Sequence, residues 1–169
     1  MSSPKRLSSI PEDVPAWASL LPGYRGYKER ELLREDDRAV RDHASAGMRK
    51  SADVLRRLSA EHLRHGPDEL LKATDWLSVE LRTLADATAL APGGYGSLFD
   101  RKQVKQEELG QLLALDLDLL RGLLEVEARV SGLEDSVAEP GRFMLVLQAL
   151  RPRVDSLRST LERRADLLR

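Results

Sequence analysis

The sequence predicts an all-α protein, an elongated antiparallel four-helix bundle with coiled-coil-like seams and a proline-rich N-terminal arm. Hydrophobic residues make up 41% of the chain and charged residues 33%, but aromatic residues only 4%. That composition is typical of helical bundles. Apolar residues also recur at helical spacing in four segments that short Gly/Pro breaks separate. We therefore expect an arm over residues 1–23 and one helical domain over residues 24–169.

The arm is predicted from its prolines, which disfavour both helix interiors and sheet ladders. These prolines are Pro4, Pro11, Pro15 and Pro22. Trp17, Leu20 and Leu21 lie among them and are too apolar for a fully solvated tail. Part of the arm should therefore dock, either on the protein's own bundle or, as a linear motif, on another protein.

The first two helices are predicted over about residues 27–65 and 67–90. One face of the first carries Leu33, Val40, Ala44, Met48, Leu55, Leu58 and His62. Gly66 and Pro67 form the break between the two helices. The second helix has a heptad seam of Leu70, Thr74, Leu77, Leu81, Leu84 and Thr88.

The third helix, predicted over residues 104–137, is so rich in leucine that no single face carries all its apolar side chains. Such a helix needs neighbours on several sides. The fourth, over residues 142–169, has a seam of Phe143, Leu147, Leu150, Val154, Leu157, Leu161 and Leu168. Pro152 falls inside this seam, so we expect a break there, either a kink or two helices meeting at Arg151.

Charge is divided between the last two helices. Residues 104–139 contain nine acidic and three basic residues, whereas residues 140–169 contain seven basic and three acidic ones. The simplest interpretation is that these helices lie side by side. The alternative is that a basic strip faces an acidic partner; the strip would consist of Arg151, Arg153, Arg158, Arg163, Arg164 and Arg169.

Several kinds of chemistry are disfavoured by composition. The formal net charge is −1, which gives no general attraction to nucleic acid, and the chain has no cysteine. His43, His62 and His65 offer half a metal site, but none follows a glutamate by three residues as a di-iron bundle requires. We therefore predict no catalytic residue, no metal and no cofactor. The sequence has no apolar run suited to a signal peptide or a membrane span, so we expect a soluble, cytoplasmic protein.

Asp116 interrupts the leucines of the third helix and lies on the same face as Leu113, Leu120 and Leu123. A buried carboxylate there must find a cation or change its protonation. We expect an ion pair with an arginine of a neighbouring helix that fixes the helix register; a catalytic carboxylate is the alternative.

The most distinctive stretch is LPGYRGYKERELLRE at residues 21–35. Its tyrosines and cations predict an interaction patch, which with the apolar arm residues comprises Trp17, Leu20, Leu21, Tyr24, Arg25, Tyr27 and Lys28. The alternative is a hydrophobic staple for the first helix. This stretch, with the later YGSLFDRKQVKQEELGQLLALDLDLL, resembles segments of small, uncharacterised all-helical bacterial proteins. The resemblance implies a helical fold and a bacterial source, and it transfers no site residue.

From these features we expect a non-enzymatic scaffold or adaptor that acts through protein–protein contacts. A homo-oligomer is favoured because the third helix has more leucines than two neighbours would cover. The alternative is a peripheral membrane-associated protein that uses the Trp17, Leu20 and Leu21 arm with adjacent basic residues. In either case we expect no nucleic acid and no small-molecule substrate as a partner.

Overall fold

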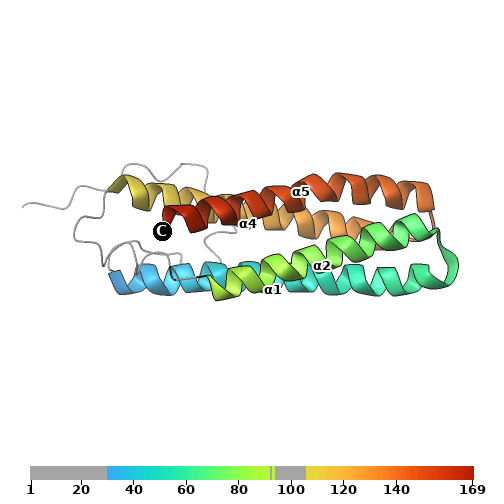
Figure 1. Cartoon of the computed structure of the whole chain (residues 1–169), viewed down its shortest axis with the longest axis horizontal. Helices are drawn as coiled ribbons and strands as arrows, with labels where there is room; N and C mark the ends of the chain where they lie inside the picture. The colour runs from blue at the N-terminus through green and yellow to red at the C-terminus, as the bar shows by residue number, and fades with distance from the viewer. Residues whose placement is uncertain (1–29, 92, 94–105) are drawn as a thin grey trace, which may run out of the picture.

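A computed structural model describes residues 30–91, 93 and 106–169, apart from the side chains of residues 30–36, 62–65, 106, 107 and 109. This part of the chain forms four α-helices and no strand (Figure 1). They are α1 (Arg30–His65), α2 (Asp68–Leu90), α4 (Gln106–Glu134) and α5 (Pro140–Leu167). The predicted all-α bundle is confirmed.

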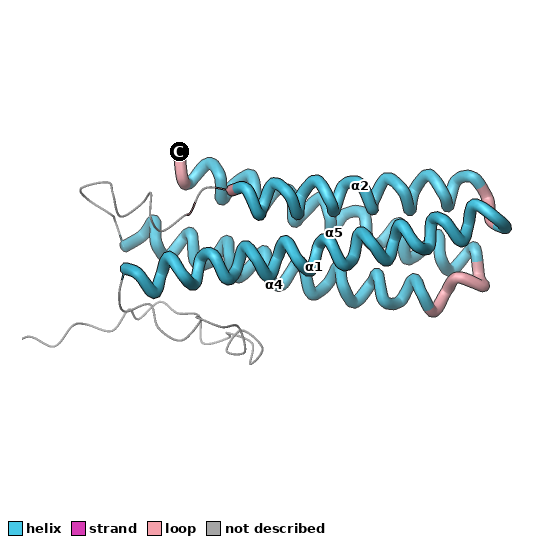
Figure 2. Tube along the Cα trace, turned by 90° about the horizontal axis from the view of Figure 1, so that it is seen from below, coloured by secondary structure: helices cyan, strands magenta, loops and turns pink. Residues whose placement is uncertain are grey.

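The bundle consists of two antiparallel hairpins that stack on each other. α1 and α2 form one hairpin and α4 and α5 the other, and stacking places α1 beside α4 and α2 beside α5 (Figures 1 and 2). Both hairpin turns lie at one end of the bundle. The starts of α1 and α4 and the ends of α2 and α5 lie at the other, which we call the open end (Figure 1).

Two helix ends differ from the sequence prediction. α4 ends at Glu134 and is followed by a turn over residues 135–138, so it is shorter than the predicted 104–137. The buried Ser136 hydroxyl donates to the Gly132 and Leu133 carbonyls, which satisfies acceptors at this helix end. α5 begins at Pro140 rather than Arg142, because proline is well tolerated in the first helical turn.

α5 runs through Pro152 as one helix, so the predicted alternative of two helices meeting at Arg151 is not found. Pro152 has no N–H to donate to the carbonyl of Gln148. Both residues are exposed, so water can take the place of the missing donor.

The apolar seams are covered within a single chain. α4 packs against both α1 and α5, as expected for a helix that needs several neighbours. Its buried apolar residues are Leu112, Leu115, Leu117, Leu119, Leu120, Leu123, Val126, Val130 and Leu133. The seam of α5 is buried as well, from Phe143 at 0% exposure to Leu157 at 1%.

The two α2 interfaces differ in closeness. α1 and α2 approach closely along their length, because small residues line their interface: Ser45 lies opposite Ala85, and Ala52 lies opposite Ser78. Ser45 Oγ donates to the Ala85 carbonyl at 2.9 Å, and Ser78 Oγ donates to the Ala52 carbonyl at 2.9 Å. α2 and α5 approach each other less closely, which leaves grooves between them.

In the part of the chain that the structure describes, no helix combines the length and apolar character needed to cross a membrane.

Candidate interaction surface

The sequence-predicted interaction patch lies outside the described residues. This applies to Trp17, Leu20, Leu21, Tyr24, Arg25, Tyr27 and Lys28, so their role stays a prediction. His43 is exposed on α1, and the side chains of His62 and His65 are not described. Within the described ranges, no three potential metal ligands come together.

Asp116 has the arginine partner that the sequence predicted. Arg164 of α5 donates from Nε to Asp116 Oδ1 at 2.9 Å and from Nη2 to Asp37 of α1. The three residues are at most 2% exposed. This contact joins α5 to α1 across the diagonal of the bundle and confirms that an arginine of a neighbouring helix holds Asp116.

Arg41 extends this buried network toward the end of α2. It donates from Nε to Asp37 Oδ2 at 3.2 Å and from Nη1 to the Ala91 carbonyl at 2.9 Å. Two guanidinium groups therefore accompany two carboxylates near the open end of the bundle. Balanced charges of this kind fix helix positions, and the network borders one of the grooves described next.

The α2/α5 face carries two grooves, one on each side of an ion pair between Glu80 and Arg158. The hydrogen bond and the charge of Glu80 raise the pKa of Arg158. The groove nearer the hairpin turns, the Trp76 groove, has a volume of about 520 Å³. The groove nearer the open end, the Arg41 groove, has a volume of about 380 Å³.

The Trp76 groove is built by two turns of α2 opposite two turns of α5. Its lining comprises Glu69, Lys72, Ala73, Trp76, Leu77, Met144, Leu147, Gln148 and Arg151. Trp76 is 38% exposed, and the Arg151 guanidinium carbon lies 4.5 Å from the centroid of its ring. This cation–π contact holds a large aromatic surface at the protein boundary.

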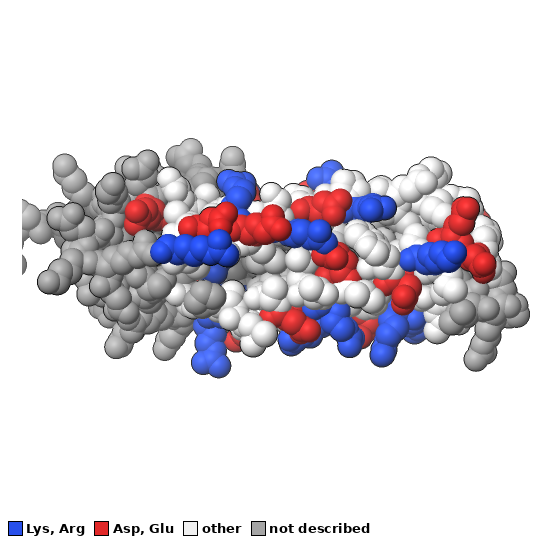
Figure 3. Space-filling view, in the orientation of Figure 1, with Lys and Arg blue, Asp and Glu red and all other residues white. Residues whose placement is uncertain are grey.

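The charges around the Trp76 groove are only partly compensated. Among the described residues, no carboxylate lies within ion-pair distance of Lys72 or Arg151. Glu69 lies in the first turn of α2, where the helix dipole stabilises its charge. Acidic and basic side chains otherwise alternate across the visible face (Figure 3). The groove therefore offers an apolar floor with two available cations.

The predicted basic strip of α5 does not form one outward face. Arg164 is buried, Arg153 pairs with Glu125 of α4 at 3.0 Å, and Arg158 pairs with Glu80 of α2. α4 and α5 are neighbours, as their opposite charges predicted. The six arginines therefore do not form one continuous strip, because Arg153 pairs toward α4, Arg158 pairs toward α2 and Arg164 lies in the core.

Sequence reasoning did not select Trp76 or Met144, and it named Arg151 only as a member of the basic strip of α5. A signal for Trp76 was present, because this tryptophan lies off the heptad seam of α2 and so has no place in the core. No signal marked Met144 or the contact of Arg151 with Trp76, since both depend on which helix lies beside α5.

Comparison of the chain with protein-family models, curated proteins and solved structures found no match. The resemblance to small helical bacterial proteins stays a prediction from the quoted segments. The geometry of the α2/α5 face is therefore the basis for a functional proposal.

Proposed function

We propose that the protein is a non-enzymatic helical adaptor that binds a segment of another protein in the Trp76 groove. The main observation behind this proposal is the partly exposed Trp76 ring, which has the Arg151 guanidinium stacked on it and shares the groove with Met144 of α5. Tryptophan and arginine are the residue types that contribute most binding energy in interfaces, and methionine adapts its shape to a partner. A preformed aromatic surface also needs little ordering when the partner arrives.

The groove indicates the chemistry of that partner. Its α2 wall extends from Glu69 to Leu77, about 12 Å at the helical rise. That length suits roughly two turns of an amphipathic helix whose apolar side chain packs on Trp76. Lys72 and Arg151 would pair with carboxylates beside that apolar side chain. We therefore expect a short segment that combines a large apolar residue with Asp or Glu.

Peptide display on the immobilised full-length chain tests this proposal. We expect a random library to yield peptides of the stated type, and Trp76→Ala to weaken their binding by at least tenfold. Val79→Ala is the matched control, because Val79 is an exposed apolar residue of α2 outside the groove. Failure to enrich any peptide family, or equal weakening by both variants, would contradict the proposal.

The charge requirement has a separate test. Arg151→Gln should weaken binding of the selected peptides several-fold and make it less sensitive to salt, because one cation is lost from the groove. Arg142→Gln on the same helix is the control, since Arg142 pairs with Glu139 and does not line the groove. If Arg151→Gln leaves peptide binding unchanged while Trp76→Ala weakens it, the adaptor proposal stands and the predicted preference for an acidic partner is wrong.

The membrane-associated alternative depends on the arm, which lies outside the described residues. No feature of the α2/α5 face favours it, and the adaptor proposal does not depend on it.

A further inference from the structure

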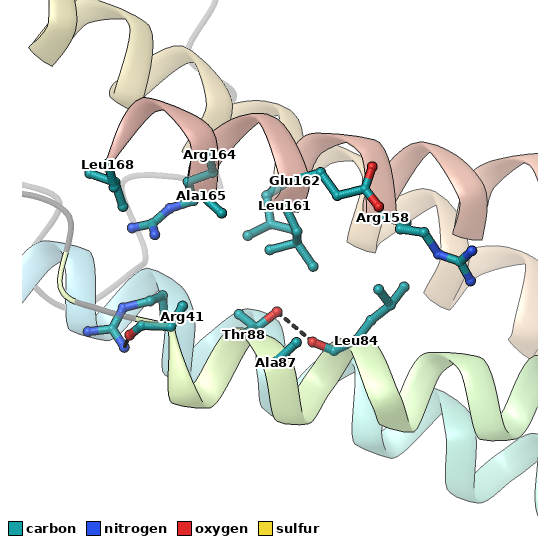
Figure 4. Close-up of a pocket in the computed structure, with 12 residues that line it drawn as sticks. Arg41, Leu84, Ala87, Thr88, Arg158, Leu161, Glu162, Arg164, Ala165 and Leu168 are labelled. Atoms are coloured by element: carbon teal, nitrogen blue, oxygen red, sulfur yellow. Dashed lines mark hydrogen bonds between the residues drawn. The ribbon is translucent and has the colours of Figure 1, made fainter.

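The Arg41 groove lies between α2 and α5 and reaches the core of the bundle (Figure 4). Its walls come from Leu84 and Ala87 of α2 with Ala91 just after it, and from Leu161 and Ala165 of α5 with Leu168 just after it. The buried Leu119 of α4 lies at its base. The groove exists because alanines occupy positions where larger residues would close the gap between the helices. Its surface is almost entirely aliphatic, and it suits a slender apolar molecule.

The two ends of the groove differ in charge: at the Arg41 end Asp37 and Asp116 balance Arg41 and Arg164, whereas at the Arg158 end two acids accompany one arginine. Figure 4 shows Arg158 and Glu162 toward one end and Arg41, Arg164 and Leu168 toward the other. Glu80 also lies at the Arg158 end, because it forms an ion pair with Arg158. Among the described residues that line the groove, Glu162 is the one acid. A negatively charged ligand group is therefore disfavoured at the Arg158 end.

Arg41 has unused hydrogen-bond donors at the opposite end. Its Nε and Nη1 donate to Asp37 and Ala91, but within the described residues Nη2 donates to no acceptor. The side chain is only 13% exposed. A largely buried guanidinium amine favours a bound acceptor, and a carboxylate makes the strongest such bond.

We propose that the Arg41 groove binds a free aliphatic carboxylate, with its chain between α2 and α5 and its carboxylate at Arg41. From Arg158 to Leu168, at the end of α5, the groove extends over ten helical rises, about 15 Å. The volume of about 380 Å³ lies in the range of small-molecule sites. This site is distinct from the Trp76 groove and does not depend on the adaptor proposal.

Titration calorimetry of the unaltered chain tests the ligand class, with each probe below its micelle concentration. Affinity should rise about fourfold for each methylene buried, so dodecanoate should bind at least tenfold more tightly than octanoate. Hexadecanoate should gain little more, because the groove has a finite length. Dodecanol should bind at least fivefold more weakly than dodecanoate. No measurable binding of dodecanoate, or equal binding of octanoate and dodecanoate, would overturn the proposal.

Matched variants test the location. Ala165→Leu should fill the groove and weaken dodecanoate binding at least tenfold. Ala149→Leu is the control and should leave this binding unchanged, because Ala149 is exposed on α5 and does not line the groove. Arg41→Gln should remove the preference for dodecanoate over dodecanol, and Arg158→Gln should leave it intact. Thermal unfolding of each variant checks that it is folded. Equal effects of the two alanine variants, or loss of the preference only in Arg158→Gln, would overturn the assignment.

Discussion

Arg164 is the residue that joins three helices near the open end of the bundle. It lies in α5 and donates to Asp116 of α4 and Asp37 of α1. Removing charges from water is costly, and the ion pairs offset that cost only while both signs are present. Replacing Arg164 alone should therefore lower the free energy of unfolding by more than the intact network contributes to it, because the two carboxylates would stay buried without their shared cation.

We expect Arg164→Met to lower the free energy of unfolding by about 3–5 kcal/mol, because two buried carboxylates lose a shared cation. Arg163→Met is a close control, since Arg163 is the adjacent residue and is exposed. Its effect should stay within about 0.5 kcal/mol. Urea unfolding of both variants measures the difference, and a similar small effect of the two would show that the buried network does not hold the helices together.

Two glycines of α4 should respond oppositely to the same substitution. A Cβ at Gly122 would lie 2.8 Å from Leu157 Cδ2, and Leu157 is buried, whereas a Cβ at Gly132 would meet nothing within 4 Å. Gly132→Ala should raise the free energy of unfolding by up to about 1 kcal/mol through helix propensity. Gly122→Ala should give no gain or a loss, because overpacking a core costs about 1–3 kcal/mol. Equal gains in chemical unfolding would mean that Leu157 moves aside freely.

At the scale of a single helix, α5 contains a proline that its fold does not require. Pro152 is exposed and interrupts the hydrogen bonding of an otherwise continuous helix. Pro152→Ala should raise the free energy of unfolding by about 1–3 kcal/mol, since it restores an N–H donor. Ser159→Ala, at another exposed position of α5, should change it by less than about 0.5 kcal/mol. A loss of stability in Pro152→Ala would indicate that the proline shapes α5 for its packing.

The helices and their pairing could largely be predicted, because each depends on a pattern within one segment. Helical periodicity placed α1 and α2 nearly to the residue, and the opposite charges of the last two segments identified α4 and α5 as neighbours. Asp116 stood out as a polar residue on an apolar face. The prediction placed the start of α5 at Arg142, two residues after its actual start at Pro140, and one of its two alternatives at Pro152, a pair of helices meeting at Arg151, is wrong because α5 passes through the proline.

At the scale of the whole molecule, the two grooves on the α2/α5 face could not be predicted. The grooves depend on α2 facing α1 with small residues while meeting α5 less closely, and this arises only when the two hairpins stack. The same stacking buries most of the leucines of α4, although Leu124 is 38% exposed, so the excess of leucine argues less strongly for a second copy. On the described surface the Trp76 groove is the best-defined feature through which an assembly could form.

That groove argues for a different protein as the partner. In a symmetric dimer the same surface meets itself, so Lys72 and Arg151 of both copies would be brought into one interface. Like charges brought together disfavour such a contact. Light scattering over a concentration series should therefore give the monomer mass of 18.9 kDa for the parent chain and for Trp76→Ala. A larger mass for the parent that Trp76→Ala abolishes would instead place a second copy in the groove and restore the homo-oligomer expected from the sequence. A larger mass unchanged by that variant would locate the assembly elsewhere, and the arm with Trp17 and Leu20 would become the first segment to alter.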